Sequence, residues 1–127
     1  VGEKLKKSCK HANVFGDLSN PVHAGNLTKV LEEIHGLYRQ PLIIAVDASL
    51  GRLENVGTIK IARGALKPGA GVNKDLPAVG NFHITGIVNV GGFMEYMVLQ
   101  NTRLFVVMKM ADIIAEGMNR GFKKFFG

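Results

Sequence analysis

The order of hydrophobic and polar residues along the chain predicts helices that alternate with strands. Residues 1–10 place lysines on one side and apolar residues on the other, which favours a helix. Two longer stretches repeat apolar residues at helical spacing, so each is expected to bury one stripe. The stripe of the first stretch consists of Leu27, Val30, Leu31, Ile34 and Tyr38, and that of the second of Leu104, Val107, Met108, Ala111, Ile114, Ala115 and Met118.

Short runs rich in β-branched and apolar residues separate these helices. We expect strands at 12–15, 42–46, 56–62 and 84–90. The order helix, strand, helix, three strands, helix is typical of an α/β fold with a mixed, mostly parallel sheet. No linker or internal repeat interrupts residues 1–127, so the pattern predicts one domain.

The run from Pro41 to Asp47 is the most informative segment. Its apolar residues predict a strand buried on both faces, and Ala48 to Arg52 are turn-forming residues. An acid at the carboxyl end of such a strand lies where open α/β sheets place their ligands. A buried carboxylate needs a partner, so Asp47 either caps the next turn through its own backbone or belongs to a functional site.

Composition narrows the class of protein. Hydrophobic residues make up 46% and charged residues 20%, which argues against disorder. The net charge of +6 is dispersed, so lysine-rich helix faces explain it better than a nucleic-acid surface. A single cysteine, Cys9, cannot form an internal disulfide. We found no membrane-length apolar segment and no secretion signal, so we expect a cytoplasmic protein that neither spans a membrane nor binds nucleic acid.

A glycine-rich loop is the first place that could bind a substrate. Gly69 and Gly71 allow positive φ, and backbone amides there could hold an anion, although the ending of a phosphate-binding P-loop is missing. Lys67 and Lys74 could bind a substrate carboxylate or shift the pKa of Asp47. The alternative is that both lysines are simply exposed.

Two further groups of residues have structural and functional interpretations. His23, Asp47 and His83 could ligate zinc if the fold brought them together, whereas separately each histidine is an ordinary surface residue. Residues 91–103 either cap a helix that Glu95 opens or line a site near Asp47. We expect no cofactor.

Four segments of the chain carry a resemblance to a family: 21–24, 44–52, 67–80 and 84–103. They resemble a short sporulation protease of endospore-forming Firmicutes over nearly the whole chain. That protein is similar to the germination protease, which degrades small acid-soluble spore proteins. The resemblance implies a three-layer α/β/α sandwich (phosphorylase/hydrolase-like) like that of the hydrogenase maturation proteases.

The resemblance also implies a catalytic arrangement. Two aspartates of the germination protease carry peptide hydrolysis; Asp47 matches the second, and the first would lie on an N-terminal strand upstream of Val1, so we expect a domain truncated at its N-terminus. The loop carries substrate-binding candidates, and amides over 69–72 could stabilise an oxyanion. Lys67 stands where the germination protease has a histidine, and the residues that match its pattern are Gly69, Gly71, Asn73 and Lys74.

The expected function is therefore carboxylate-assisted peptide hydrolysis in the sporulating cell or forespore. The substrate would be a protein or peptide, such as a small acid-soluble spore protein. The alternative is a catalytically inactive relative that binds a regulatory partner in the same groove. A basic nucleic-acid module is a third and weaker alternative. Apolar Phe122, Phe125 and Phe126 near the C-terminus could support an oligomer.

Overall fold

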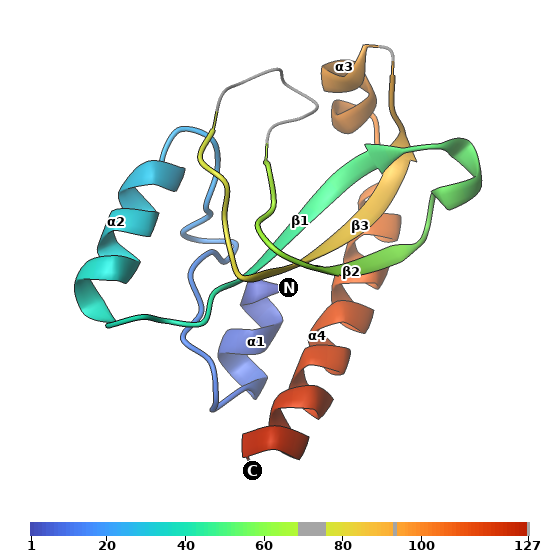
Figure 1. The fold of residues 1–127 in the computed structure, drawn as a ribbon. Helices are drawn as coiled ribbons and strands as arrows, with labels where there is room; N and C mark the ends of the chain where they lie inside the picture. Colours follow the sequence, from blue (N-terminus) through green and yellow to red (C-terminus); the bar gives the residue numbers. More distant parts are fainter. Residues whose placement is uncertain (69–75, 93, 127) are drawn as a thin grey trace.

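The computed structural model describes residues 1–68, 76–92 and 94–126 as a mixed α/β fold (Figure 1). The helices and the strands of the sheet lie near the predicted segments, except that no strand separates the first two helices and that a short 3₁₀ helix, η1, follows the first strand. The elements in chain order are α1 (Gly2–Ser8), α2 (Leu27–Leu37), β1 (Ile44–Gly51), η1 (Leu53–Asn55), β2 (Ile59–Arg63), β3 (Phe82–Val90), α3 (Glu95–Gln100) and α4 (Leu104–Phe126).

The three strands of the described residues form one mixed sheet in the order β1-β3-β2. β1 runs parallel to β3, with Val46 opposite Ile84 and Asp47 opposite Thr85. β2 runs antiparallel to β3 and places Ile61 opposite Ile84. The mixed sheet agrees with the sequence pattern. In the described part of the chain, however, β1 lies at the edge of the sheet. Its residues are mostly half-buried or exposed, so the prediction of a strand buried on both faces is wrong.

Two sequence predictions about strands are wrong. The predicted turn after Asp47 is strand as far as Gly51, because the ladder to β3 continues to the pair Gly51 and Val90. Residues 12–15 form no strand; Phe15 instead packs edge-to-face against Tyr38 at the end of α2, with ring centroids 6.4 Å apart. In both segments a long-range contact determines the backbone conformation. The local pattern of residues carries no information about that contact, so the sequence could not predict it.

Helix α4 packs on the sheet through β3. A Cβ atom placed on Gly86 would lie 3.0 Å from the Met110 Cε atom, so the strand backbone and the helix are in close contact here. The buried residues of α4 are Met110, Ile114 and Ala115. The predicted stripe is therefore partly wrong: Met108 is 40% exposed and Leu104 is 72% exposed, because the face that meets the sheet is rotated toward Met110.

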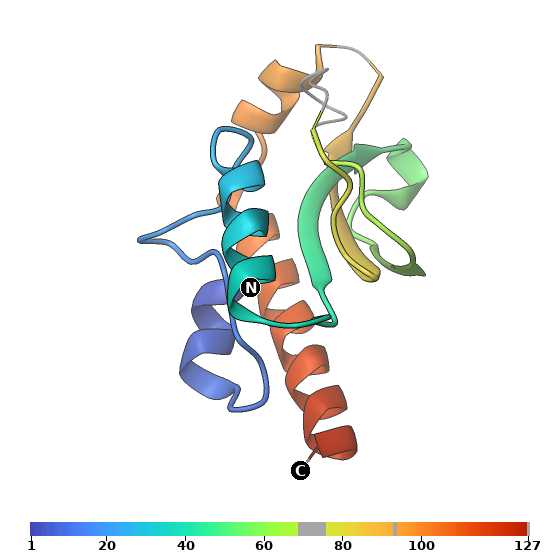
Figure 2. The same ribbon diagram turned by 60° about the vertical axis from the view of Figure 1, so that its left-hand side comes forward.

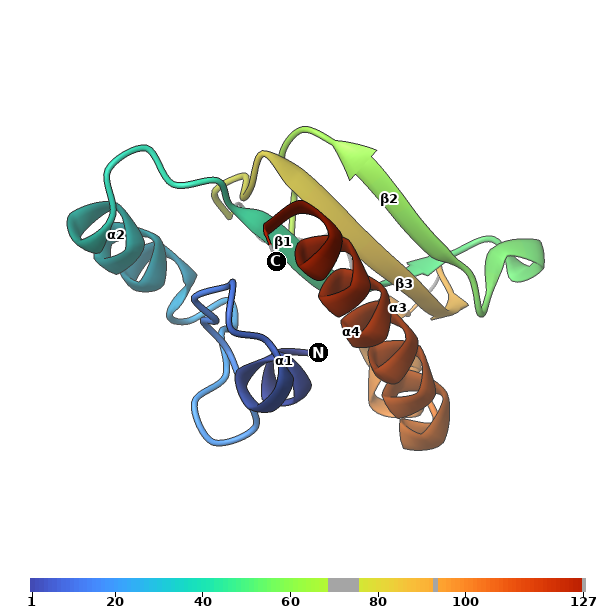
Figure 3. The same cartoon turned by 90° about the horizontal axis from the view of Figure 1, so that it is seen from below.

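The helices α1, α2 and α4 lie on the same side of the sheet in both turned views (Figures 2 and 3). Helix α1 packs on α4, where Lys4 forms an ion pair with Asp112 and the Asn119 amide donates a hydrogen bond to the Ser8 hydroxyl at 2.6 Å. This arrangement is a mixed α/β fold with a small sheet.

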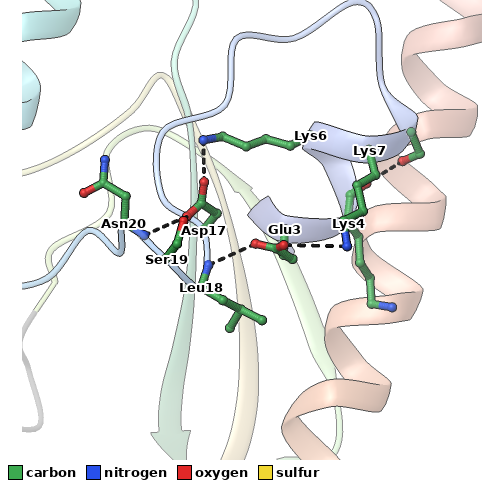
Figure 4. Close-up of polar contacts among 9 residues, drawn as sticks. Glu3, Lys4, Lys6, Lys7, Asp17, Leu18, Ser19 and Asn20 are labelled. Carbon is green, nitrogen blue, oxygen red and sulfur yellow. Dashed lines mark hydrogen bonds and ion pairs between the residues drawn. The ribbon is translucent and has the colours of Figure 1, made fainter.

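Polar contacts hold α1 against the segment that follows it (Figure 4). The Lys6 ammonium donates to the Asp17 carboxylate, and the Asn20 backbone N–H donates to the same carboxylate at 2.7 Å. The Leu18 N–H donates to the Glu3 carboxylate at 3.1 Å. The bond from Lys6 is the main cause that holds the pKa of Asp17 well below its usual range. Two acids and one lysine thereby fix the path of the chain toward α2.

Candidate functional site

Asp47 lies in the middle of β1, and its carboxylate turns back to its own strand. The Ala48 N–H donates to the Asp47 carboxylate at 2.9 Å, so the local backbone contact expected of this acid is present. Asp47 is an exposed residue by its accessible surface, yet many atoms crowd around its carboxyl group; this desolvation raises the pKa of Asp47, and the bond from Ala48 offsets only part of that rise. A carboxyl group that holds its proton to higher pH than usual is suited to general acid or base chemistry.

The carboxylate lies along the free edge of β1. The N–H of Ile43 donates to the Asn81 side chain at 2.9 Å, and its C=O accepts from the Asn81 N–H at 2.7 Å. Ile43 thus faces β3, and because backbone groups alternate along a strand, those of Ile44, Val46 and Ala48 face away from β3. The bond from Asp47 to Ala48 therefore occupies one of these outward donors.

A groove of about 1230 Å³ opens next to this edge, between β1 and the helices. Its lining includes β1 from Ile44 to Leu50, and apolar side chains of α2 and α4 such as Leu31 and Ile114. The charged residues that line it are Glu3, Asp17, Arg39, Asp47, Lys67 and Glu95. The exposed part of the lining is mostly apolar, and a carboxylate in such surroundings loses hydration, which explains the raised pKa of Asp47. A groove of this kind can bind an extended peptide.

The glycine-rich loop is only partly described. Lys67 is exposed and lines the same groove as Asp47, as the sequence suggested for a lysine of this loop. Gly69, Gly71, Asn73 and Lys74 lie outside the described residues, and so does the predicted oxyanion site over 69–72.

The two candidate histidines each have a local partner. His23 lines the groove, and its Nδ1 atom accepts a hydrogen bond from the Gly25 N–H at 3.0 Å. The Nδ1 atom of His83 lies 2.9 Å from the Gly64 carbonyl oxygen. Within residues 1–68, 76–92 and 94–126, no three His, Cys, Asp or Glu side chains come close enough together to hold a metal ion. The structure does not assemble His23, Asp47 and His83 into such a set.

Glu95 lies in the segment for which the sequence left two alternatives, capping a helix or lining a site near Asp47. It is the first residue of α3, as expected, and its carboxylate also lines the groove. A Cβ atom placed on Gly91 would lie 3.1 Å from the Leu50 Cβ atom and 3.4 Å from the Glu95 carboxylate. The signal in the sequence was the glycine pair after β3, because glycine permits this close approach to the end of β1.

Comparison with known proteins identifies the family. A family model described as "Protein of unknown function (DUF1256)" matches residues 1–117. The chain belongs to this family. A relative from Bacillus subtilis (strain 168), "Uncharacterized protein YyaC", is 58% identical over 120 residues, which make up 94% of this chain. The chain spans 58% of the length of that curated relative. No solved structure matches the chain.

The helices of this family member differ from membrane spans. Among the residues that the structure describes, no helix is long and apolar enough to cross a bilayer. The longest, α4, carries charged residues along its length, including Lys109, Asp112 and Glu116.

Proposed function

We propose that this chain is part of a sporulation-associated peptidase related to the germination protease, with Asp47 as one of two catalytic carboxylates in a three-layer α/β/α domain. The observation that carries the proposal is a carboxyl group of raised pKa in an apolar groove large enough for a peptide. Perturbed acids in grooves are frequent at catalytic sites. The motif resemblance over 44–52 and 67–80 supports the choice of peptide hydrolysis.

The chemistry would divide between two carboxyl groups that share one proton. The ionised group accepts a proton from water, whose oxygen attacks the scissile carbonyl carbon. The protonated group donates to the carbonyl oxygen, and the C–N bond breaks when the amine takes up a proton. Asp47 suits the protonated role because desolvation favours its neutral form. Lys67, on the same groove, would hold a substrate carboxylate or the carbonyl oxygen.

The second acid has two candidate positions. The resemblance places it upstream of Val1, on a strand that this chain does not contain. Within the described residues, Glu95 is another acid that lines the groove and could take that role. A variant of each acid separates the two possibilities: Glu95→Gln keeps the activity if the second acid lies upstream and abolishes it if Glu95 is that acid.

The proposal is tested with the full-length protein and purified small acid-soluble spore proteins. Fragments are followed by mass spectrometry for the parent, Asp47→Asn and a control, Asp112→Asn, which changes an exposed acid on α4. We expect fragments from the parent and the control, and a loss of at least about 100-fold in Asp47→Asn, the range for removing a general acid or base. Equal cleavage by the parent and Asp47→Asn would refute the assignment.

One feature favours a second function, that of an inactive relative which binds a partner peptide in the groove. Lys67 stands where the germination protease has a histidine, and it is an exposed cation that lines the same groove as Asp47. In that function the parent cleaves no substrate, yet it binds an acidic peptide through Lys67. A Lys67→Gln variant would then lose binding, whereas Asp47→Asn would retain it.

A further inference from the structure

The last turns of helix α4 project beyond the sheet and expose aromatic side chains (Figures 1 and 2). Phe125 is 81% exposed and Phe126 is 65% exposed, so water surrounds most of both rings. The rings of Phe122 and Phe126 lie together with centroids 6.2 Å apart, and the ring of His11 lies 6.0 Å from that of Phe126. Clustered apolar side chains at a surface mark an interaction site, because water solvates them poorly.

Helical spacing places these rings on one side of α4. Residues three and four apart are neighbours on a helix, so Phe122, Phe125 and Phe126 form one stripe. Going back along the helix, the same stripe passes through half-buried Met118 and buried Ala115. The side of α4 that packs against the molecule at Ala115 is therefore exposed to solvent at Phe125.

Lysines lie beside the aromatic stripe. Lys123 and Lys124 are exposed, and they take part in none of the ion pairs found among the described side chains. Glu116 is the last acid of α4 and is already paired with Arg120. The helix dipole favours cations in a last turn, which accounts for the lysines but not for the exposed rings beside them. A partner that matches both features is negatively charged and also has an apolar layer.

We propose that this end of α4 docks the protein on the surface of an anionic lipid bilayer, without crossing it. The surface that makes the contact, the α4-end patch, consists of His11, Phe122, Lys123, Lys124, Phe125 and Phe126. Aromatic rings bury themselves at the boundary between headgroups and acyl chains, and lysines are attracted to anionic headgroups. The proposal does not depend on peptidase activity.

The charge and shape of the α4-end patch favour a bilayer over two other partners. A two-fold contact between copies of the patch would bring Lys123 and Lys124 of both chains together, and the net charge of +6 adds to this repulsion. Single-stranded nucleic acid is bound in basic grooves that follow its backbone. The rings of the patch lie on a projecting helix end, which is unlike such a groove.

Vesicle sedimentation with the full-length protein tests the role of the lysines. The vesicles consist of phosphatidylcholine with or without phosphatidylglycerol. We expect binding only to the anionic vesicles, and weaker binding as salt is added, because salt screens exposed charges. The double variant Lys123→Gln, Lys124→Gln should bind about 30-fold more weakly, since each basic residue near the surface contributes about fivefold.

The matched control is the double variant Lys29→Gln, Lys60→Gln, which removes two exposed lysines on α2 and β2. It has the same net charge as the first double variant and should bind within about twofold of the parent. Equal binding by the two double variants would overturn the proposal. Equal binding of the parent to neutral and anionic vesicles would also overturn it.

A pair of tryptophan variants tests whether the aromatic end enters the bilayer. Phe125→Trp and Phe105→Trp replace exposed rings in the last and the first turn of α4, and the 127 residues contain no tryptophan of their own. A tryptophan elsewhere in the full-length protein contributes equally to both variants. With anionic vesicles, the fluorescence of Phe125→Trp should shift to shorter wavelength, and that of Phe105→Trp should not. Equal spectra with and without vesicles for Phe125→Trp would contradict insertion.

Two further measurements detect the other partners. Sedimentation velocity of the parent and Phe125→Ala, without lipid, shows whether the patch joins two copies. A dimer that Phe125→Ala dissociates, in a parent that binds no vesicles, would assign the patch to self-association and overturn the proposal. Titration with a single-stranded oligonucleotide is the second measurement. Binding that requires Lys123 and Lys124, again without vesicle binding, would assign the patch to nucleic acid and overturn the proposal as well.

Discussion

The pKa of Asp47 links its environment to a measurable pH dependence of stability. Burial raises the pKa, so above about pH 4 the folded protein holds a proton that the unfolded chain has lost. Stability therefore falls as the pH rises through the raised pKa. An asparagine side chain at this position does not titrate. We expect Asp47→Asn to be at least as stable as the parent at pH 7, and the difference to disappear below about pH 4.

Thermal melts at about pH 3.5 and pH 7 check this expectation. The control is Asp112→Asn, an exposed carboxylate paired with Lys4, which should change stability by less than about 1 kcal/mol at either pH. A variant at Asp47 that is clearly less stable than the parent at pH 7 would contradict the direction of the pKa shift. If Asp47→Asn is stable but no longer cleaves substrate, Asp47 contributes to function at a cost in folding stability.

The ion pair between α1 and the following segment predicts acid sensitivity at the scale of an element. The bond from Lys6 lowers the pKa of Asp17, so Asp17 stays ionised in the folded protein below the pH at which the unfolded chain takes up a proton, about pH 4. The contribution of the ionised Asp17 carboxylate to folding stability is complete above that pH and is lost as the pH falls further. We expect Asp17→Asn to lower the melting temperature at pH 7. Below about pH 4, the melting temperature of the variant should fall less steeply with pH than that of the parent.

The control for Asp17 is Glu116→Gln on α4. Glu116 pairs with Arg120 one helical turn away at 2.6 Å, and both side chains are well exposed, so the loss should be small. Near-ultraviolet signals of Phe15 and Tyr38, which pack beside the same segment, report whether the effect is local. Equal pH profiles for Asp17→Asn and the parent would show that the ion pair does not hold α1 in place.

Substituting a glycine in α4 and a glycine in β3 should change the free energy of unfolding in opposite directions. Gly117 lies within α4, where an added Cβ would meet no atom within 4 Å, so Gly117→Ala should raise stability by about 0.5–1 kcal/mol through helix propensity. A Cβ atom added to Gly86 would lie 3.0 Å from the Met110 Cε atom, so Gly86→Val should lower stability by roughly 1–3 kcal/mol. Urea unfolding measures both. A stabilising Gly86→Val would show that α4 does not pack on β3 there.

The elements also show how far the sequence alone could predict this fold. The helical stripes located α2 and α4, and the apolar run before Asp47 located β1 and the candidate acid. The extent of β1 to Gly51 and the lack of a strand at 12–15 depend on pairing with β3 and on the contact between Phe15 and Tyr38. The groove depends on how α2 is placed across from β1, a long-range relation that no spacing in the sequence encodes.

At the scale of the whole molecule, the groove leaves part of the apolar interior open to solvent. Leu31 on α2 is half-buried and lines the groove, whereas Ile84 in the middle of β3 is 8% exposed. The side chain of Leu31 therefore packs less completely than that of Ile84. The two positions should respond differently when the side chain is shortened.

Alanine variants of these residues give the corresponding prediction. Ile84→Ala should lower the free energy of unfolding by about 2–5 kcal/mol, because it leaves a cavity in a packed core. Leu31→Ala should lower it clearly less, because water already reaches the groove that Leu31 lines. Urea unfolding measures both values. Equal losses for the two variants would mean that Leu31 is packed as tightly as Ile84 and that the groove is closed to water.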